Sequence, residues 1–300
     1  MPRLHPHKPV EWHCRMAGRP FVLFAWRMDR RRAITLLGAG LLVAACTPKG
    51  SKNVNKTGSE KIAYGEGPSQ FGELFRPGGT ARGVVVVIHG GFWHEQYDAS
   101  LGRPLAKDLA TNGWVAWNLE YRRIENGGGW PTTFDDIAAG IDKLADIPHL
   151  ATDKIVTLGH SAGGHLGVWA AARPGLVGSN WANPKVGVTA VISQAGVLNL
   201  AAAAAMHLGN DAVHEFMGGK VDNRYLSADP SSQIPLKVPV WCIHGSSDTT
   251  VPISQSIDYV KAAKAAGGRA ELVEVDGDHF DLINPSTQAW QKTLAILDSL

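Results

Sequence analysis

Residues 159–164 read Gly-His-Ser-Ala-Gly-Gly, and this hexapeptide constrains the fold more than any other segment of the chain. It follows an apolar run at 155–158 and precedes a helix-like stretch at 165–173. A Gly-x-Ser-x-Gly sequence between a strand and a helix predicts a sharp turn that presents the serine hydroxyl at the carboxyl edge of a sheet. The sequence therefore predicts Ser161 as a nucleophile. It also places the backbone N–H of Ala162 where it can stabilise an oxyanion.

Short apolar runs alternate with amphipathic stretches along most of the chain. The runs that we expect to form strands lie at 84–88, 114–118, 155–158, 186–192, 238–243 and 270–275. The stretches that we expect to form helices lie at 101–111, 134–147, 165–173, 254–266 and 286–297. Continuous apolar strands separated by helices predict an α/β protein whose mostly parallel sheet is covered on both faces. Residues 196–235 interrupt this alternation with helix-like pieces at 200–206 and 211–217, which predicts a small cap insertion.

A serine hydroxyl needs a general base to become a nucleophile, and the base needs a carboxylate to orient it. In this kind of fold the three groups follow the chain order serine, acid, histidine. Five histidines follow Ser161, and we predict His279 as the base because it lies in the loop after the last predicted strand. Asp248 lies just beyond the strand at 238–243, and we predict it as the acid. The aspartates beside His279 are closer in sequence, but the carboxylate must approach Nδ1 from a fixed direction.

The segment at 89–93 reads His-Gly-Gly-Phe-Trp and directly follows an early strand. Paired glycines allow backbone N–H groups to turn inward without steric cost. We therefore predict an oxyanion hole formed by the N–H groups of Gly91 and Phe92 together with that of Ala162. Three nearby side chains are expected to have structural roles: His89, Trp93 and His160.

The positive charge of the chain is concentrated in its first 45 residues. These contain 8 Lys/Arg and 2 Asp/Glu, whereas residues 46–300 contain 21 and 25, so the formal charge of +2 conceals a net negative body. This distribution argues against nucleic acid as a partner. Only three cysteines occur (Cys14, Cys46 and Cys242), which excludes a disulfide framework.

Residues 28–45 have the composition of a lipoprotein-type export signal. Arginines at 30–32 precede a 13-residue apolar segment that is too short to span a bilayer. Cys46 follows Val-Ala-Ala, as in a bacterial lipobox, and the arginines also resemble a twin-arginine signal. The sequence therefore predicts lipidation of Cys46 and export to the periplasmic or extracellular face of a bacterial membrane.

Residues 1–27 fit no part of an export signal, and we interpret them as an extension upstream of a start at Met28. Residues 46–60 are polar and predict a linker, and residues 61–300 predict one α/β domain with its cap near 196–235.

Several of these motifs together resemble the α/β-hydrolase superfamily over residues 70–300. The His-Gly-Gly-Phe-Trp segment, the Asn-Leu-Glu-Tyr-Arg segment at 118–122 and the Gly-His-Ser-Ala-Gly-Gly segment resemble those of kynurenine formamidases and related esterases. The resemblance implies a serine hydrolase of esters or amides without a metal or other cofactor. It carries the roles of nucleophile, acid and base to Ser161, Asp248 and His279.

The predicted function is hydrolysis of a carboxylic ester of a small or medium-sized substrate through an acyl-enzyme. Export favours an external ester over a cytoplasmic metabolite. An alternative is arylformamidase activity, which would give preferential turnover of N-formylkynurenine over p-nitrophenyl acetate. An alternative of another class is a membrane-tethered binding protein on a hydrolase scaffold, which would not react with a fluorophosphonate. The sequence does not determine the oligomeric state.

Overall fold

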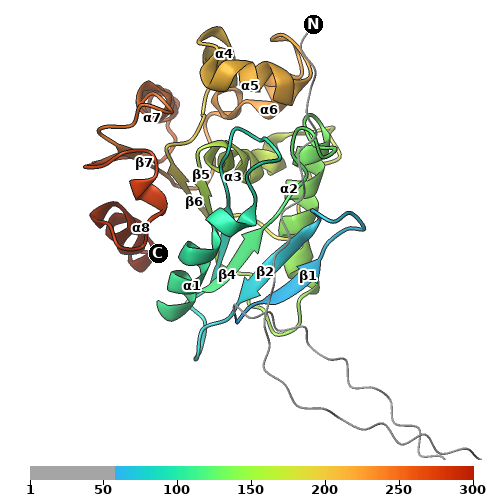
Figure 1. Cartoon of the computed structure of the whole chain (residues 1–300), viewed down its shortest axis with the longest axis vertical. Helices are drawn as coiled ribbons and strands as arrows, with labels where there is room; N and C mark the ends of the chain where they lie inside the picture. Colours follow the sequence, from blue (N-terminus) through green and yellow to red (C-terminus); the bar gives the residue numbers. More distant parts are fainter. Residues whose placement is uncertain (1–57) are drawn as a thin grey trace, which may run out of the picture. The chain divides into compact units, whose positions relative to one another are not determined.

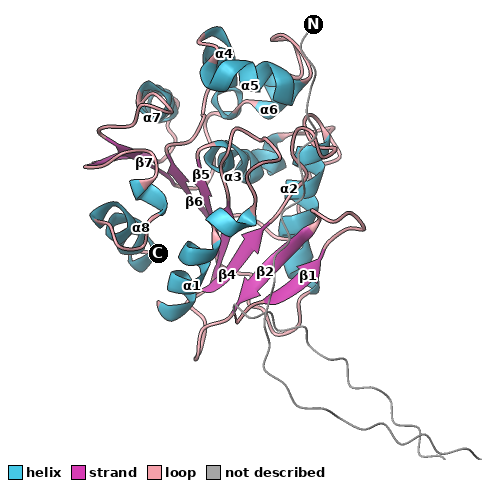
Figure 2. Cartoon of the chain, in the orientation of Figure 1, coloured by secondary structure: helices cyan, strands magenta, loops and turns pink. Residues whose placement is uncertain are grey.

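An eight-stranded sheet runs through residues 58–300, the part of the chain that this computed structural model describes (Figures 1 and 2). Its strand order is β1-β2-β4-β3-β5-β6-β7-β8. Strand β2 runs antiparallel to both of its neighbours, and the strands from β4 to β8 are parallel. The strands span Glu60–Ala63 (β1), Phe71–Phe75 (β2), Val84–Ile88 (β3), Val115–Leu119 (β4), Ile155–His160 (β5), Ala190–Gln194 (β6), Val240–Gly245 (β7) and Ala270–Val275 (β8).

Helices connect these strands. The α-helices span Arg103–Thr111 (α1), Thr132–Asp142 (α2), Ala162–Ala172 (α3), Leu200–Ala205 (α4), Leu208–Met217 (α5), Tyr225–Ala228 (α6), Ser254–Ala265 (α7) and Gln288–Asp298 (α8). Short 3-10 helices span Ala99–Leu101 (η1), Lys143–Asp146 (η2), Arg173–Gly175 (η3), Pro230–Gln233 (η4) and Asp281–Ile283 (η5). Within α5, residues 209–211 have positive φ, so the regular helix occupies its second half, as the piece predicted at 211–217 does.

Strand β3 explains why the predicted strands are continuous apolar runs. Val84, Val86 and Ile88 pack into one hydrophobic cluster with side chains of α2 and α3. Val85 and Val87 point to the opposite face and pack with side chains of α1 and α8. Because side chains alternate between the two faces of a strand, both sets must be apolar when helices cover both faces. The prediction of a mostly parallel sheet covered on both faces is confirmed.

The structure differs from the sequence-based expectation at one edge of the sheet and at several strand ends. Strand β6 begins at Ala190, four residues after the predicted start, and β4, β6 and β7 end one or two residues beyond their predicted ends. The edge strands β1 and β2 were not expected, because β1 alternates in burial and β2 follows a polar, glycine-containing segment. Gly72 of β2 lies against the Trp117 ring, since a Cβ on Gly72 would be 2.2 Å from that ring. Strand β5 extends to His160, two residues beyond its predicted end, and therefore reaches the turn that contains Ser161.

The segment at 196–235, predicted as a cap, contains α4, α5 and α6 between β6 and β7 (Figure 1). Phe216 of α5 stacks on the buried Trp93 ring with their centroids 4.4 Å apart. The His165 Nε2–H of α3 donates to the carbonyl oxygen of Ala228 at 2.9 Å. The insertion thus packs on α3 and on the loop that follows β3, at the carboxyl ends of the parallel strands.

The predicted leader, Cys46 and most of the predicted linker lie outside the described residues. Strand β1 begins at Glu60, one residue before the predicted domain boundary. Within residues 58–300, no helix is both long and apolar enough to cross a bilayer. Cys242 is buried in β7, as expected of a small hydrophobic residue, and burial raises the pKa of its thiol to about 12.

Candidate active site

Ser161 occupies a strained turn between β5 and α3. Its backbone has φ 56° and ψ −120°, a region that residues with a side chain rarely adopt. The turn is compatible only with glycine at its flanks, because a Cβ on Gly163 would lie 2.0 Å from the Ile88 carbonyl oxygen. A Cβ on Gly159 would lie 2.0 Å from the carbonyl oxygen of Gly163. The Ser161 N–H donates to the Gln194 carbonyl at 2.8 Å, which fixes the turn to β6.

Ala162 is the first residue of α3, and its N–H is one of the helix-terminal donors that have no partner within the helix. The positive end of the helix dipole lies at the same point. Both effects favour a negative charge next to Ser161. This is the position that the sequence predicts for one oxyanion donor.

The other predicted oxyanion donors lie in the loop after β3. Gly91, Phe92 and Trp93 have successive positive φ values of 112°, 50° and 61°. A hydrogen bond from the His94 N–H to the Gly91 carbonyl closes this turn at 3.0 Å. Within residues 58–300, no group accepts a hydrogen bond from the N–H of Gly91 or Phe92. The hydrogen-bonding capacity of these two N–H groups is therefore unused within the described residues.

A buried polar network holds this loop. The Glu120 carboxylate accepts hydrogen bonds from the N–H groups of Ala99 and Tyr121, and it forms an ion pair with Arg123. His89 Nε2 lies 3.3 Å from the same carboxylate, and the His89 ring stacks on Tyr121. The Tyr121 hydroxyl donates to the His89 carbonyl at 2.9 Å. Burial lowers the pKa of His89 to about 3, which suits the structural role expected for this residue.

Asp248 and His279 come from the loops after β7 and β8 and form a buried pair. The His279 Nδ1–H donates to Asp248 Oδ2 at 2.7 Å, and the other carboxylate oxygen accepts the N–H groups of Thr250 and Val251. Burial alone would raise the pKa of Asp248. Hydrogen bonds from His244, His279 and the Val251 N–H outweigh burial and hold that pKa well below its usual range. Asp248 is therefore an ionised carboxylate that fixes the tautomer of His279.

The aspartates near His279 in sequence form no hydrogen bond or ion pair with its ring. Asp278 accepts the N–H of Phe280, and Asp281 accepts the N–H of Asp278, so both shape the loop. The carboxylate that contacts His279 Nδ1 therefore comes from the loop after β7 and not from the loop of His279 itself.

The side chain of His160 joins the Ser161 turn to the main chain of His279. Within residues 58–300 there is no hydrogen bond between Ser161 Oγ and His279 Nε2, and such contacts are often long before a substrate binds. Instead, the His160 Nε2–H donates to the His279 carbonyl at 2.9 Å, and the two rings lie 4.4 Å apart. The structure thus brings the predicted nucleophile, acid and base to one edge of the sheet.

Sequence reasoning assigned no role to His244, which the structure places beside Asp248. Its Nε2 lies 3.4 Å from Asp248 Oδ2 and 2.9 Å from the Val251 carbonyl, and its Nδ1 lies 2.8 Å from Ser256 Oγ. The only sequence signal for the contact between His244 and Asp248 is their spacing of four residues at the end of β7.

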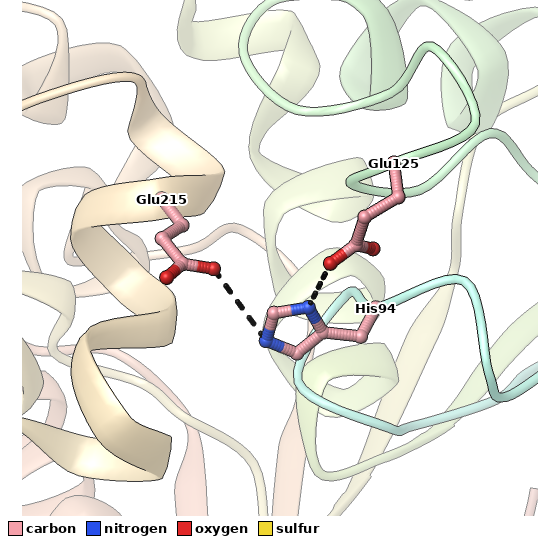
Figure 3. A group of neighbouring side chains, drawn as sticks. All are labelled: His94, Glu125 and Glu215. Atoms are coloured by element: carbon pink, nitrogen blue, oxygen red, sulfur yellow. Dashed lines mark hydrogen bonds and ion pairs between the residues drawn. The ribbon is translucent and has the colours of Figure 1, made fainter. Parts of the chain in front are cut away.

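One group of side chains in the described part of the chain has the donor types of a metal site. His94, Glu125 and Glu215 have their ligand atoms within 4.8 Å of one another (Figure 3). Glu125 lies 2.9 Å from His94 Nδ1, whereas Glu215 lies 3.9 Å from His94 Nε2. Because the carboxylates face opposite ring nitrogens, their placement suits ion pairing with the imidazole better than sharing one cation. The group links the loop after β3 to the cap helix α5.

A family model and several known proteins are similar to this chain. The family model BD-FAE matches residues 75–262. The chain is 28% identical to the isoprenylcysteine alpha-carbonyl methylesterase ICME of Arabidopsis thaliana, over 82% of this chain and 61% of the relative. It is 25% identical to Esterase LipC of Mycobacterium tuberculosis, over 75% of this chain and 60% of the relative. The chain thus spans less than two thirds of the length of these relatives.

Solved structures have the same architecture. Thermogutta terrifontis esterase 2, phosphoramylated by tabun, matches with a TM-score of 0.65 and 25% identity, over 81% of this chain and 93% of the other. The fold is the α/β-hydrolase fold, as the sequence predicts.

Proposed function

The chain belongs to the BD-FAE family, and from this membership and its site we propose that it is a serine hydrolase that cleaves carboxylic esters of small or medium-sized substrates. The observation that carries the proposal is the buried Asp248–His279 pair, 2.7 Å apart, joined to the strained Ser161 turn. The relatives named as esterases support the ester over the formamide as substrate.

We propose that acylation uses these residues in the following order. His279 Nε2 accepts the hydroxyl proton of Ser161 as Oγ attacks the carbonyl carbon of the ester. Asp248 stabilises the imidazolium that forms, because its carboxylate accepts the Nδ1–H. The same imidazolium then gives its Nε2 proton to the leaving alkoxide, which departs as an alcohol.

Deacylation repeats these steps with water. His279 removes a proton from the water, the hydroxide attacks the acyl carbon, and the proton returns to Ser161 Oγ as the acid leaves. In both steps the negatively charged former carbonyl oxygen of the tetrahedral intermediate accepts hydrogen bonds from the N–H groups of Ala162, Gly91 and Phe92. Loss of one such donor typically lowers kcat by roughly 100- to 1000-fold.

A substrate panel tests this proposal. We expect p-nitrophenyl acetate and butyrate to be hydrolysed with a higher kcat/KM than N-formylkynurenine, and Ser161→Ala to remove the activity. Clear preference for the formamide would replace the ester proposal with the arylformamidase alternative. Failure of every ester and amide would support the non-catalytic binding alternative.

The location of the protein is a second proposal, which rests on residues outside the described range. We propose that the chain is exported and anchored through a lipid on Cys46, because the apolar segment and the Val-Ala-Ala-Cys sequence precede a polar linker. Metabolic labelling with a palmitate analogue should mark the wild type in the membrane fraction and not Cys46→Ala. Equal labelling of both, or of neither, would contradict the anchor.

A further inference from the structure

His160 is the last residue of β5 and is joined by a peptide bond to Ser161. Its side chain is buried, and its Nε2 lies 2.9 Å from the His279 carbonyl oxygen. A carbonyl oxygen can only accept, so the ring hydrogen lies on Nε2 and Nδ1 carries a lone pair. Within residues 58–300, no other group donates a hydrogen bond to the His279 carbonyl.

The opposite side of the His160 ring faces the loop that carries the predicted oxyanion donors. A Cβ on Gly90 would lie 3.0 Å from His160 Nδ1 and 2.9 Å from Ser161 Cβ. His160 and Gly90 also line a small cavity of about 10 Å³ together with His89 and Gln194. One side chain therefore contacts the nucleophile turn, the loop of the base and the loop after β3.

We propose that His160 is a positioning residue, which fixes the main chain of His279 so that the imidazole of His279 meets the Ser161 hydroxyl. The proposal rests on the proposed serine hydrolase function. The hydrogen bond from His160 holds the carbonyl group of His279, whose side chain is the proposed base. Few rotatable bonds therefore separate this fixed carbonyl group from His279 Nε2. A misplacement of about 1 Å in such a site can lower the rate by roughly 100-fold.

His165 offers a matched control one turn into α3. Its ring is also buried, its Nε2–H also donates to a main-chain carbonyl at 2.9 Å, and its Nδ1 also has no partner among the described residues. The carbonyl belongs to Ala228 of the cap segment and not to His279. A purely structural role would make the two histidines equivalent.

The test compares His160→Phe, His160→Asn, His160→Gln and His165→Phe by kcat, KM and thermal midpoint. Gln can place an amide N–H near the position of His Nε2, whereas Asn reaches only the position of Nδ1 and Phe has no donor. We expect His160→Phe and His160→Asn to lower kcat by roughly 10- to 100-fold with KM within about twofold of wild type. His160→Gln should restore kcat to within about threefold of wild type. His165→Phe should lower the thermal midpoint and leave kcat within about threefold, because it does not act on His279.

The outcomes separate this inference from the proposed function. If the wild type hydrolyses esters and the folded His160 variants keep their kcat, the positioning role is wrong. It is also wrong if His160→Gln is as impaired as His160→Asn, or if His165→Phe loses kcat equally. If His160→Phe does not fold, the Gln and Asn pair decides. A wild type that neither hydrolyses esters nor reacts with a fluorophosphonate would instead overturn the proposed function.

Discussion

The two halves of the site are stabilised by different interactions. The nucleophile half consists of the Ser161 turn and the loop at 89–93. Its turns depend on backbone strain and on glycines that admit close backbone contacts, and the buried Glu120 network supports the loop from behind. The acid–base half consists of the loops of Asp248 and His279, and its shape depends on hydrogen bonds between buried side chains. A substitution in the first half should therefore disturb folding and chemistry together. In the second half, chemistry should be lost while the fold persists.

Asp248→Asn gives the largest expected effect on the acid–base half. The amide would donate to His279 Nδ1 and so favour the tautomer that cannot accept the serine proton. We expect kcat to fall by about 10,000-fold, the loss typical of this change in a serine triad. Steady-state kinetics with p-nitrophenyl acetate measures the loss, and circular dichroism should show an unchanged fold. A loss below tenfold would mean that Asp248 is not the orienting acid.

Gly163→Ala addresses the nucleophile half. Its Cβ would meet the Ile88 carbonyl oxygen at 2.0 Å and the His89 carbonyl oxygen at 2.5 Å, so the main chain must shift. We expect the free energy of unfolding to fall by about 3 kcal/mol and activity to fall with it. The control is Gly175→Ala, whose Cβ would meet nothing within 4 Å and should change stability by less than about 0.5 kcal/mol. Equal stability of the two variants would remove the steric argument.

Acid should destabilise the nucleophile half and the helix that follows it, through buried histidines. Burial lowers the pKa of His89 and His160 to about 3 and that of His165 to about 4. The folded rings stay neutral while the unfolded ones take up protons below about pH 6.5. Stability is thus fully present above that pH and is lost as the pH falls toward 4, by about 1.4 kcal/mol per pH unit for each histidine. Denaturant unfolding at pH 7 and pH 5 measures this, and His165→Phe should show a shallower dependence. A flat profile would contradict the neutral rings.

Glu215→Gln should have the smallest effect. Glu215 and His94 are 3.9 Å apart with side chains 53% and 22% exposed, so their ion pair is screened by water. We expect a stability change of at most about 0.5 kcal/mol and an unchanged kcat. Glu125→Gln is the comparison, because Glu125 lies 2.9 Å from His94 and also accepts the Glu95 N–H. A larger effect from Glu215→Gln than from Glu125→Gln would show that the link to the cap matters more than local contacts.

The same contrast explains what the sequence could predict. The inner strands, such as β3, were recognisable because helices cover both faces of the sheet. Every side chain of such a strand is buried, so the strand is a continuous apolar run. The Ser161 turn was recognisable because Gly159 and Gly163 lie within two residues of the serine in the chain. The loops of Asp248 and His279 could be placed because parallel strands bring their carboxyl ends to one edge.

Contacts between distant side chains could not be predicted in the same way. His160 and His279 are 119 residues apart, and nothing local distinguishes His160 from His165. His244 donates toward Asp248 only because β7 ends where the following loop turns back. Strand β2 is short, and its place is fixed by pairing with β4 rather than by its own pattern.

The central claim is that Ser161 is a nucleophile activated by the Asp248–His279 pair, and covalent labelling tests it most directly. Intact-mass spectrometry of the protein treated with a fluorophosphonate should show one adduct, which peptide mapping places on Ser161. Ser161→Ala should give no adduct, and Asp248→Asn should label far more slowly than the wild type. Labelling of another residue, or no labelling of a folded wild type that binds ester analogues, would contradict the account.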